Sequence, residues 1–174
     1  MEEFKISPSQ LKTAFDPSTG CLRKWAFGKI EGIRSPSTAA QTLGTNMHTA
    51  GENYLRSGTV PDLRKKPDRI FAAGMHLLPD RDKVAGVELG FDLRFDDDVV
   101  FHGFMDFYGA HFAGDHKSTS NFRYMLSPEK LQVDPQGVIY GMKVAEIYSL
   151  NMTQPLDLIW VYYLTRGTPE ARKV

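Results

Sequence analysis

Cysteine is almost missing from this chain of 174 residues, in which Cys21 is the one cysteine. That scarcity excludes an internal disulfide framework and any cluster held by cysteines of this chain alone. No apolar run approaches the roughly 18 residues that suggest a membrane span. The N-terminus, MEEFKISPSQ, is acidic and polar and lacks a signal-peptide pattern. We therefore expect a cytoplasmic protein with no membrane partner.

Net charge is also lacking, because 21 Lys and Arg residues offset 21 Asp and Glu residues. A nucleic-acid partner would have to be attracted by local basic patches, since the overall field gives no help. Two short basic clusters exist: Arg23, Lys24, Lys29 and Arg34, and then Arg64, Lys65, Lys66 and Arg69. Clusters of this kind are more often ordinary solvated faces.

What is present indicates one globular domain over residues 1–174, because 41% of the residues are hydrophobic and 24% are charged. Residues 1–80 are expected to be mostly helical, and residues 84–164 to form the core that carries the site. The chain ends at Val174, soon after its last apolar segment. That position is compatible both with a C-terminal truncation and with a minimal domain.

The first half of the chain predicts helices. Residues 5–15 indicate a short extended piece and then a helix capped by Ser7 or Ser9. Further helices are predicted over 21–30, 39–57 and 69–78, with a loop over 58–69. Apolar residues recur at helical spacing in the long helix: Leu43, Met47, Ala50 and Tyr54. Gly44 in the same helix indicates close approach of another backbone.

The second half predicts strands and one more helix. Residues 84–95 alternate, with Val87, Leu89, Phe91, Leu93 and Phe95 on one face. This strand, the strand at 99–108 and the strand that carries Asp115 form an antiparallel meander. Asp134-Pro135 starts a helix that runs to about residue 149, with its buried side expected at Val138, Met142 and Ala145. The apolar strand 156–164 follows. The fold class is therefore α/β, a mixed central sheet of meander plus crossover strand, flanked by helices.

The segment from His102 to Lys117 carries the polar residues of greatest interest. It predicts two strands joined by a turn at residues 109–111, which brings Asp106 near Asp115. Asp115 and Lys117 are two apart on a strand and share a face, with His116 on the opposite face. Two carboxylates and a lysine can hold a divalent cation and organise water beside a phosphate. Taken alone, an Asp-x-Lys pair is usually a solvated surface pair.

Other polar residues fall at defined positions on predicted elements. His48 lies at the edge of the apolar stripe of helix 39–57, with Glu52 one turn later. A lone helical histidine is more often structural than a ligand, and a helical metal site built on His48 and Glu52 is a weak alternative. Gln136 and Tyr140 share a face of the last helix.

The ordered series His48, Glu88, Gly103-x-x-Asp106, Asp115-x-Lys117 and Gln136-x-x-x-Tyr140 resembles the PD-(D/E)xK nuclease superfamily, and specifically its RecB-like exonuclease branch. That branch includes the nuclease domains of bacterial recombination helicase–nucleases, the CRISPR adaptation nucleases and many phage exonucleases. The resemblance runs from about Ile6 to Leu164 and implies a restriction-endonuclease-like core.

The resemblance implies roles for individual residues. His48, Asp106 and Asp115 match metal ligands, and the backbone carbonyl of His116 would complete the metal shell. Lys117 matches the catalytic lysine, so that the catalytic set is Asp106, Asp115 and Lys117. The residues expected to place the DNA phosphate are Gln136 and Tyr140. Glu88 matches an upstream strand glutamate whose role is accessory: a second-metal group, a group that supports the ligands, or a solvated residue. Carboxylates favour Mg²⁺ or Mn²⁺, and one imidazole shifts the preference toward Mn²⁺.

One feature of some family members is incomplete in this sequence. Members with an iron–sulfur cluster carry one cysteine near the N-terminus and three after the last helix, and such clusters need about four thiolates. Cys21 stands at the first of those positions, and the other three are absent from the sequence. We expect no cluster in this chain and expect Cys21 to be a buried structural thiol.

The resemblance leads to a metal-dependent DNA nuclease, most simply an exonuclease acting on DNA ends or single strands. The expected setting is recombination, repair or phage DNA processing in a bacterial or phage-infected cell. Expected partners are DNA and either a second copy of the chain or a recombination helicase. The alternative is an inactive nuclease fold that serves as a DNA-binding or scaffold protein. The intact acidic residues, histidine and lysine argue against that alternative, because buried unpaired polar groups are costly.

Overall fold

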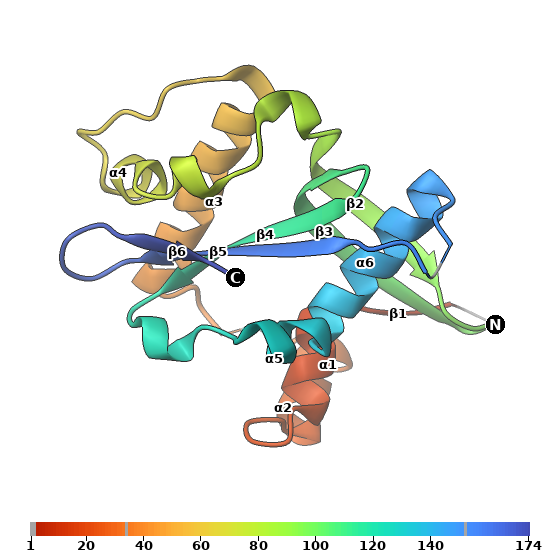
Figure 1. Ribbon diagram of the computed structural model, residues 1–174. Coiled ribbons are helices and arrows are strands. Elements are labelled where there is room, and N and C mark those ends of the chain that lie inside the picture. Colours follow the sequence, from red (N-terminus) through yellow and green to blue (C-terminus); the bar gives the residue numbers. More distant parts are fainter. Residues whose placement is uncertain (1–2, 34, 152) are drawn as a thin grey trace.

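The computed structural model of the protein describes residues 3–33, 35–151 and 153–174, so Arg34 of the first basic cluster lies outside it. The helices are α1 (Pro8–Phe15), α2 (Leu22–Lys29), α3 (Ala39–Ser57), α4 (Lys66–Ala72), α5 (Pro128–Gln132) and α6 (Pro135–Tyr148). The strands are β1 (Phe4–Ile6), β2 (Gly86–Arg94), β3 (Val99–Gly109), β4 (Phe112–Thr119), β5 (Asp157–Leu164) and β6 (Ala171–Lys173) (Figure 1). Within the described ranges, no helix has both the length and the apolarity needed to cross a membrane.

The strands form one mixed sheet in the order β1-β3-β4-β5-β6, with β2 paired to β3. The expected antiparallel meander is present, because β2 pairs with β3 and β3 pairs with β4 in antiparallel fashion. β5 then joins β4 in parallel after the crossover through α6. The α/β prediction is therefore confirmed. The sequence did not anticipate β6, and the short extended piece at the N-terminus proves to be β1, a parallel partner of β3.

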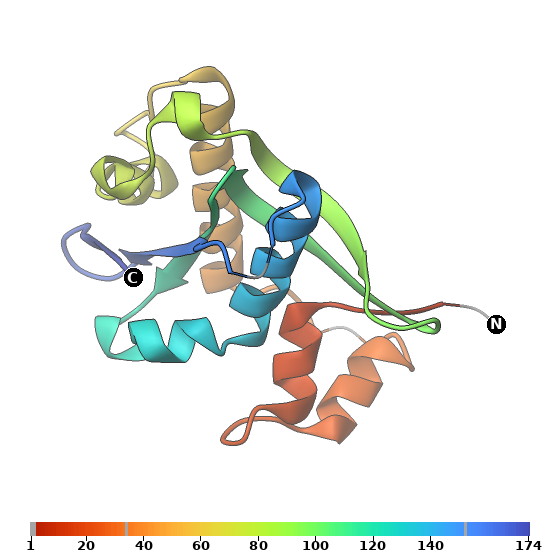
Figure 2. The ribbon, with the colours of Figure 1, turned by 45° about the vertical axis from the view of Figure 1, so that its right-hand side comes forward.

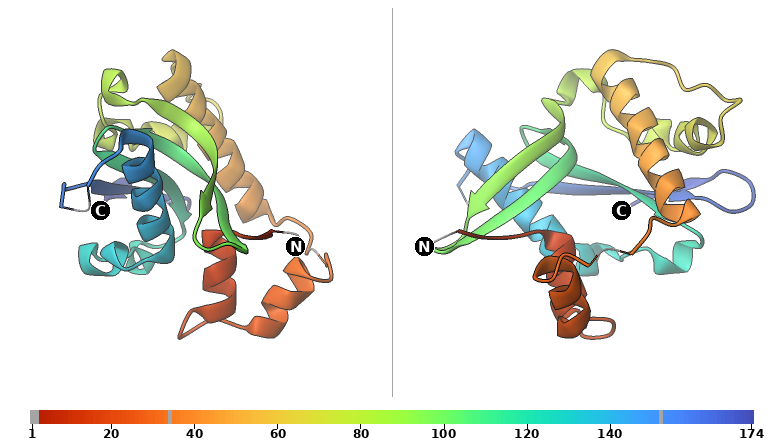
Figure 3. Two further views of the ribbon diagram at one scale, coloured as in Figure 1. Left: turned by 90° about the vertical axis from the view of Figure 1, so that its right-hand side faces the viewer. Right: turned by 180° about the vertical axis from the view of Figure 1, so that it is seen from behind.

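Helices cover the two faces of the sheet and divide the core into two clusters. α6 covers one face, and α3 covers the other (Figure 3, left). On the α6 face the largest buried side chain is Trp160 of β5, packed near Tyr140. On the α3 face Met47 packs with Val161 and Tyr163 of the same strand. Alternate residues of β5 thus enter different clusters, which explains its nearly continuous apolar sequence.

One edge of β3 opens in its middle. β2 pairs along β3 from Val100 to Tyr108 on one side. On the other side β1 pairs only with residues 99–101 and β4 only with residues 107–109. Within the described residues, β3 therefore has no strand partner on that edge over residues 102–106. The α1–α2 hairpin lies at the end of the sheet where β1 pairs, away from α4 (Figure 2).

Two sequence predictions about helices are wrong. The helix expected over 69–78 lies earlier, at Lys66–Ala72, and only a short 3-10 turn covers Met75–Leu77. Pro67 sits in its first turn, a position that needs no backbone N–H. In α6, Val138 and Met142 are 43% and 36% exposed, and the buried side carries Tyr140 and Val144 instead. Apolar residues surround this helix, so periodicity could not select the face.

Two predictions about individual side chains are also wrong. Cys21 is exposed, because it is the residue directly before α2. Phe95 is 65% exposed, because β2 ends one residue earlier and the alternation no longer directs its ring toward the core.

Candidate active site

The long helix α3 brings His48 close to the sheet. Thr38 begins the helix with a reciprocal capping box to Gln41, which satisfies backbone donors that would otherwise be unpaired. Glycines allow close approach to β4: a Cβ at Gly44 would lie 3.0 Å from Ser118 Oγ, and one at Gly51 would lie 2.9 Å from His116 Nε2. The expected approach at Gly44 is thus to a side chain of β4. His48 lies between these two glycines.

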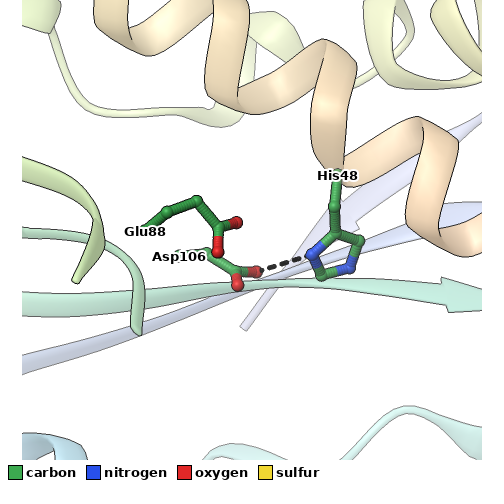
Figure 4. A group of neighbouring side chains, drawn as sticks. All are labelled: His48, Glu88 and Asp106. Carbon is green, nitrogen blue, oxygen red and sulfur yellow. Dashed lines mark ion pairs between the residues drawn. The ribbon is translucent and has the colours of Figure 1, made fainter. Parts of the chain in front are cut away.

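His48, Glu88 and Asp106 form a compact group from three elements, α3, β2 and β3. Each offers one ligand atom, and these atoms all lie within 4.8 Å of one another (Figure 4). His48 Nδ1 is 3.2 Å from Asp106 Oδ2. One imidazole and two carboxylates are a donor set that suits Mn²⁺ or Mg²⁺. The residues present therefore fit a divalent cation.

Electrostatics in this group also favour a cation. Burial raises the pKa of Glu88, and the nearby Asp106 carboxylate raises it further. Burial would also raise the pKa of Asp106, but the hydrogen bond and charge of His48 outweigh that effect and lower it. For His48, burial lowers the pKa and Asp106 more than offsets this, so the pKa is raised. Glu88 is therefore the carboxyl of this group whose pKa stays raised, because the charge of His48 does not outweigh burial and Asp106 there.

The backbone is irregular where Glu88 lies opposite Asp106. Glu88 has a φ of 52°, a left-handed conformation that costs a residue with a Cβ about 1–2 kcal/mol. The side-chain alternation of β3 shifts at the same place, because Met105 and Tyr108 contribute to the same core cluster. Strain of this kind persists when the surroundings hold it, and it is concentrated at functional sites.

The Asp106 side chain also bridges β3 and β4 at a point where their backbones do not pair. Its Oδ2 accepts a hydrogen bond of 2.6 Å from the backbone N–H of His116 on β4. The carbonyl of Phe104 accepts a hydrogen bond from the Tyr140 hydroxyl. Side chains thus satisfy backbone groups on the facing edges of β3 and β4 where these two strands do not pair, and the site lies in the opening between them.

On the α6 side of this opening, Gln136 connects the Asp115-x-Lys117 motif to the helix. Asp115 Oδ1 accepts a hydrogen bond of 2.6 Å from Gln136 Nε2, and Lys117 Nζ donates one of 2.8 Å to Gln136 Oε1. Lys117 Nζ is also 2.6 Å from Asp115 Oδ2 and forms an ion pair with it. Gln136 Nε2 also donates to the Tyr140 hydroxyl at 2.8 Å. The Gln-x-x-x-Tyr spacing therefore aligns the lysine and the acid.

Burial acts in opposite directions on the pKa values of Asp115 and Lys117. Burial raises the pKa of Asp115 to about 6, and the Asp106 carboxylate adds to the effect. Burial lowers the pKa of Lys117, but the neighbouring Asp115 more than offsets this, so the pKa is raised. Lys117 is therefore protonated at neutral pH. A protonated lysine can stabilise negative charge, whereas a general base would need a depressed pKa.

His116 points away from this pair, as the strand alternation predicts. Burial lowers the pKa of its imidazole to about 4, so the ring is neutral. Its Nδ1 is 3.1 Å from the Tyr163 hydroxyl, and its Nε2 is buried without a hydrogen-bond partner among the residues that the structure describes. Phe71 meets the ring edge-on at a centroid distance of 5.8 Å. The imidazole thus packs as a core residue behind Asp115.

The structure brings most of the predicted site residues to the opening between β3 and β4, with two differences in arrangement. Glu88, expected only as an accessory residue, is one of the three residues of the compact group. Asp115, expected as a central ligand, directs its oxygens to Gln136 and Lys117 instead. Ligation by Asp115 and by the carbonyl of His116 stays a prediction. Glu52 lies one turn after His48 but pairs with Arg56 at 3.0 Å.

Sequence analysis missed two contacts that hold the site in position. Tyr163 of β5 supports His116 across 47 residues of sequence. Lys12 Nζ of α1 lies 2.5 Å from Oδ2 of Asp134, the N-cap of α6. This ion pair connects the N-terminal hairpin to the helix that carries Gln136. Asp134 was identified as a cap, but no local pattern could have named the partner of either contact.

The fold is similar to that of a known structure. A crystal structure from Eubacterium rectale, of a provisionally assigned exonuclease, superposes with a TM-score of 0.59 over 98% of this chain and 71% of that chain, at 14% sequence identity. At this identity the similarity shows a nuclease-like fold. No family model matches the sequence. No curated protein matches it either.

Proposed function

We propose that the protein is a metal-dependent deoxyribonuclease of the RecB-like type, which hydrolyses phosphodiester bonds and acts as an exonuclease on DNA ends. One observation carries the proposal: His48, Glu88 and Asp106 converge within 4.8 Å beside a buried lysine–carboxylate pair. This combination supplies hard ligands for a cation and a fixed positive charge in one opening of the sheet. The likeness to a structure assigned as an exonuclease supports the same class.

His48, Glu88 and Asp106 would hold Mg²⁺ or Mn²⁺, with Asp115 as a further ligand. When bound, the cation supplies Lewis acidity toward the phosphate and lowers the pKa of a coordinated water. Asp106 has a second task, because its bond to the backbone N–H of His116 keeps β3 and β4 at a fixed separation. Loss of its charge would therefore remove a ligand and disturb the width of the opening.

Lys117 provides positive charge where the phosphate gains negative charge during hydrolysis. Gln136 fixes this ammonium through its amide oxygen and holds Asp115 through its amide nitrogen. Tyr140 orients that amide in turn. Burial raises the pKa of Tyr140, so its hydroxyl stays protonated and acts only as a donor and acceptor.

The first test is a cleavage assay on end-labelled linear DNA and circular DNA, each single- and double-stranded, in Mn²⁺, Mg²⁺ or chelator. We expect metal-dependent loss of linear DNA by the wild type, with circles spared. Lys117→Ala and Asp106→Asn should lower the rate at least about 100-fold, the size expected when one transition-state charge is removed. Lys130→Ala changes an exposed lysine of α5 and should cleave at the wild-type rate.

Three outcomes would change this proposal. Cleavage of circles as well as linear DNA would make the enzyme an endonuclease. Cleavage that survives chelation or the Lys117→Ala change would remove the assigned site. DNA binding without cleavage by the wild type would favour the scaffold alternative.

A further inference from the structure

Phe104 is a large apolar side chain that the fold leaves in solvent beside the candidate active site. It is 58% exposed, whereas the next residue of β3, Met105, is fully buried. Exposed phenylalanines are common on protein surfaces and need no explanation one by one. This one differs by position, because it lies two residues before Asp106 on β3, about 7 Å along the strand, and it lines the cleft at the open edge of that strand.

The ring of Phe104 is held in place by its surroundings. Gly90 is its register partner on β2, and a Cβ at Gly90 would lie 3.0 Å from Phe104 Cε1. His102 meets the ring edge-on at 5.8 Å between centroids. The carbonyl of Phe104 is fixed by the Tyr140 hydroxyl. The strand therefore presents a preorganised ring, in a place where a mid-strand glycine leaves it room.

The hollow next to the ring suits a nucleic-acid backbone. A cleft of about 420 Å³ lies between the start of α1, the open edge of β3 and α6. Its polar lining includes Lys5, Ser7, Ser9, Lys29 and Gln136. Lys5 is paired with Asp92 at 2.5 Å, while Lys29 has its ammonium over the ring of Phe4 at 5.6 Å. Lysine ammonium groups and serine hydroxyls donate hydrogen bonds to phosphate oxygens. Gln136 connects the cleft to Lys117.

We propose that Phe104 is a stacking platform for a nucleobase next to the scissile phosphate, and that the substrate is therefore single-stranded DNA or an unpaired DNA end. This inference rests on the proposed nuclease function. A base within a duplex already has both faces stacked, so only an unpaired base can lie against the ring. An aromatic platform beside a groove lined with lysine is the arrangement by which proteins bind single strands without reading sequence.

The test is binding of a fluorescent 20-nucleotide oligothymidine and of a blunt duplex of the same length, measured by anisotropy in chelator so that no cleavage occurs. Phe104→Leu keeps an apolar side chain but removes the aromatic face. We expect it to weaken single-strand binding about 10- to 100-fold, the effect of losing one base–aromatic stack, and to change duplex binding less than threefold. Phe104→Trp should bind single strands at least as tightly as the wild type.

Phe95→Leu is the matched control, since it makes the same change at a phenylalanine that is 65% exposed directly after β2. It should bind both DNAs as the wild type does. Equal single-strand affinity of Phe104→Leu and wild type, or an equal loss for both DNAs, would overturn this inference while metal-dependent cleavage by the wild type left the nuclease proposal intact. A wild type that neither binds nor cleaves DNA would overturn both.

Discussion

At the scale of the residue, Glu88 combines a strained backbone with a ligand position. Its φ of 52° suits glycine better than any residue with a Cβ. We expect Glu88→Gly to be more stable than Glu88→Ala by about 1 kcal/mol, because glycine adopts this conformation without the steric cost. Both variants should bind Mn²⁺ at least about tenfold more weakly. Urea denaturation in chelator measures the stabilities, and calorimetric titration measures the metal affinity.

The same pair of substitutions at Glu52 provides the control. Glu52 lies within α3, where glycine is less stable than alanine by about 1 kcal/mol. The order of stabilities at position 52 should therefore be the reverse of that at position 88, with Mn²⁺ affinity unchanged. A Glu88→Ala protein as stable as Glu88→Gly would show that the left-handed backbone at this position is not a source of strain.

The positions of single site residues followed from sequence where a motif fixed both residue type and spacing. Gly103-x-x-Asp106 and Asp115-x-Lys117 named side chains that the structure brings to one opening. The compact group formed by Glu88 with His48 could not be foreseen, because it depends on an irregular strand position rather than on local sequence. The hydrogen bond from His116 N–H to Asp106 likewise arises only because β3 and β4 separate at that point.

At the scale of the element, the pairing of β3 with β4 depends on Gly114. A Cβ at this position would overlap the ring of Phe107, its register partner, which is fully buried. We expect Gly114→Ala to lower the free energy of unfolding by about 1–3 kcal/mol or more, the usual cost of overpacking a core. Chemical denaturation with an unchanged m-value measures this loss.

Gly28→Ala is the contrasting substitution, because Gly28 lies in α2 and, among the described residues, nothing beyond its chain neighbours and its own helix backbone lies within 4 Å of the Cβ it would gain. Alanine there should raise stability by up to about 1 kcal/mol through helix propensity. If Gly114→Ala proved as stable as Gly28→Ala, the Phe107 ring would not lie over β4 as described. The pair thus separates a packing effect from the general preference for alanine.

Elements with a strong period or a clear cap were predicted well. The alternation over residues 84–95 predicted β2, and Asp134-Pro135 predicted the start of α6. The buried face of α6 was not predictable, since the sheet selects it and the helix is apolar on several sides. β6 is only three residues long and is defined by its pairing with β5, so its own sequence carries little signal.

At the scale of the whole molecule, a neutral chain concentrates buried negative charge at one place. Burial and the Asp106 carboxylate raise the pKa values of Glu88 and Asp115, whereas His48 and the His116 backbone N–H outweigh burial at Asp106 and lower its pKa. The fold thus disfavours ionisation of Glu88 and Asp115 until a cation binds. Stability and metal affinity should therefore change together, since whatever binds only the folded state stabilises it.

The stability of the metal-free protein should depend on pH through the titration of Asp115. Its pKa is raised from 3.8 to about 6 in the folded state, so folding favours the protonated carboxyl. The stability this group contributes is therefore fully present below about pH 4 and is lost as the pH rises through 6. Asp115→Asn does not titrate. In chelator, the stability of Asp115→Asn relative to the wild type should increase from pH 4 to pH 7 by on the order of 3 kcal/mol.

The quantity to measure is the difference in the free energy of unfolding between Asp115→Asn and the wild type. His116 contributes a pH dependence of opposite sign, and it does so in both proteins. Burial lowers its pKa to about 4, so its contribution is lost as the pH falls toward that value. Subtracting the free energy of unfolding of the wild type from that of Asp115→Asn at each pH cancels the contribution of His116. At pH 7, Mn²⁺ should then raise the melting temperature of the wild type more than that of the variant. A difference that stays flat between pH 4 and pH 7 would mean that Asp115 is not held buried beside Asp106.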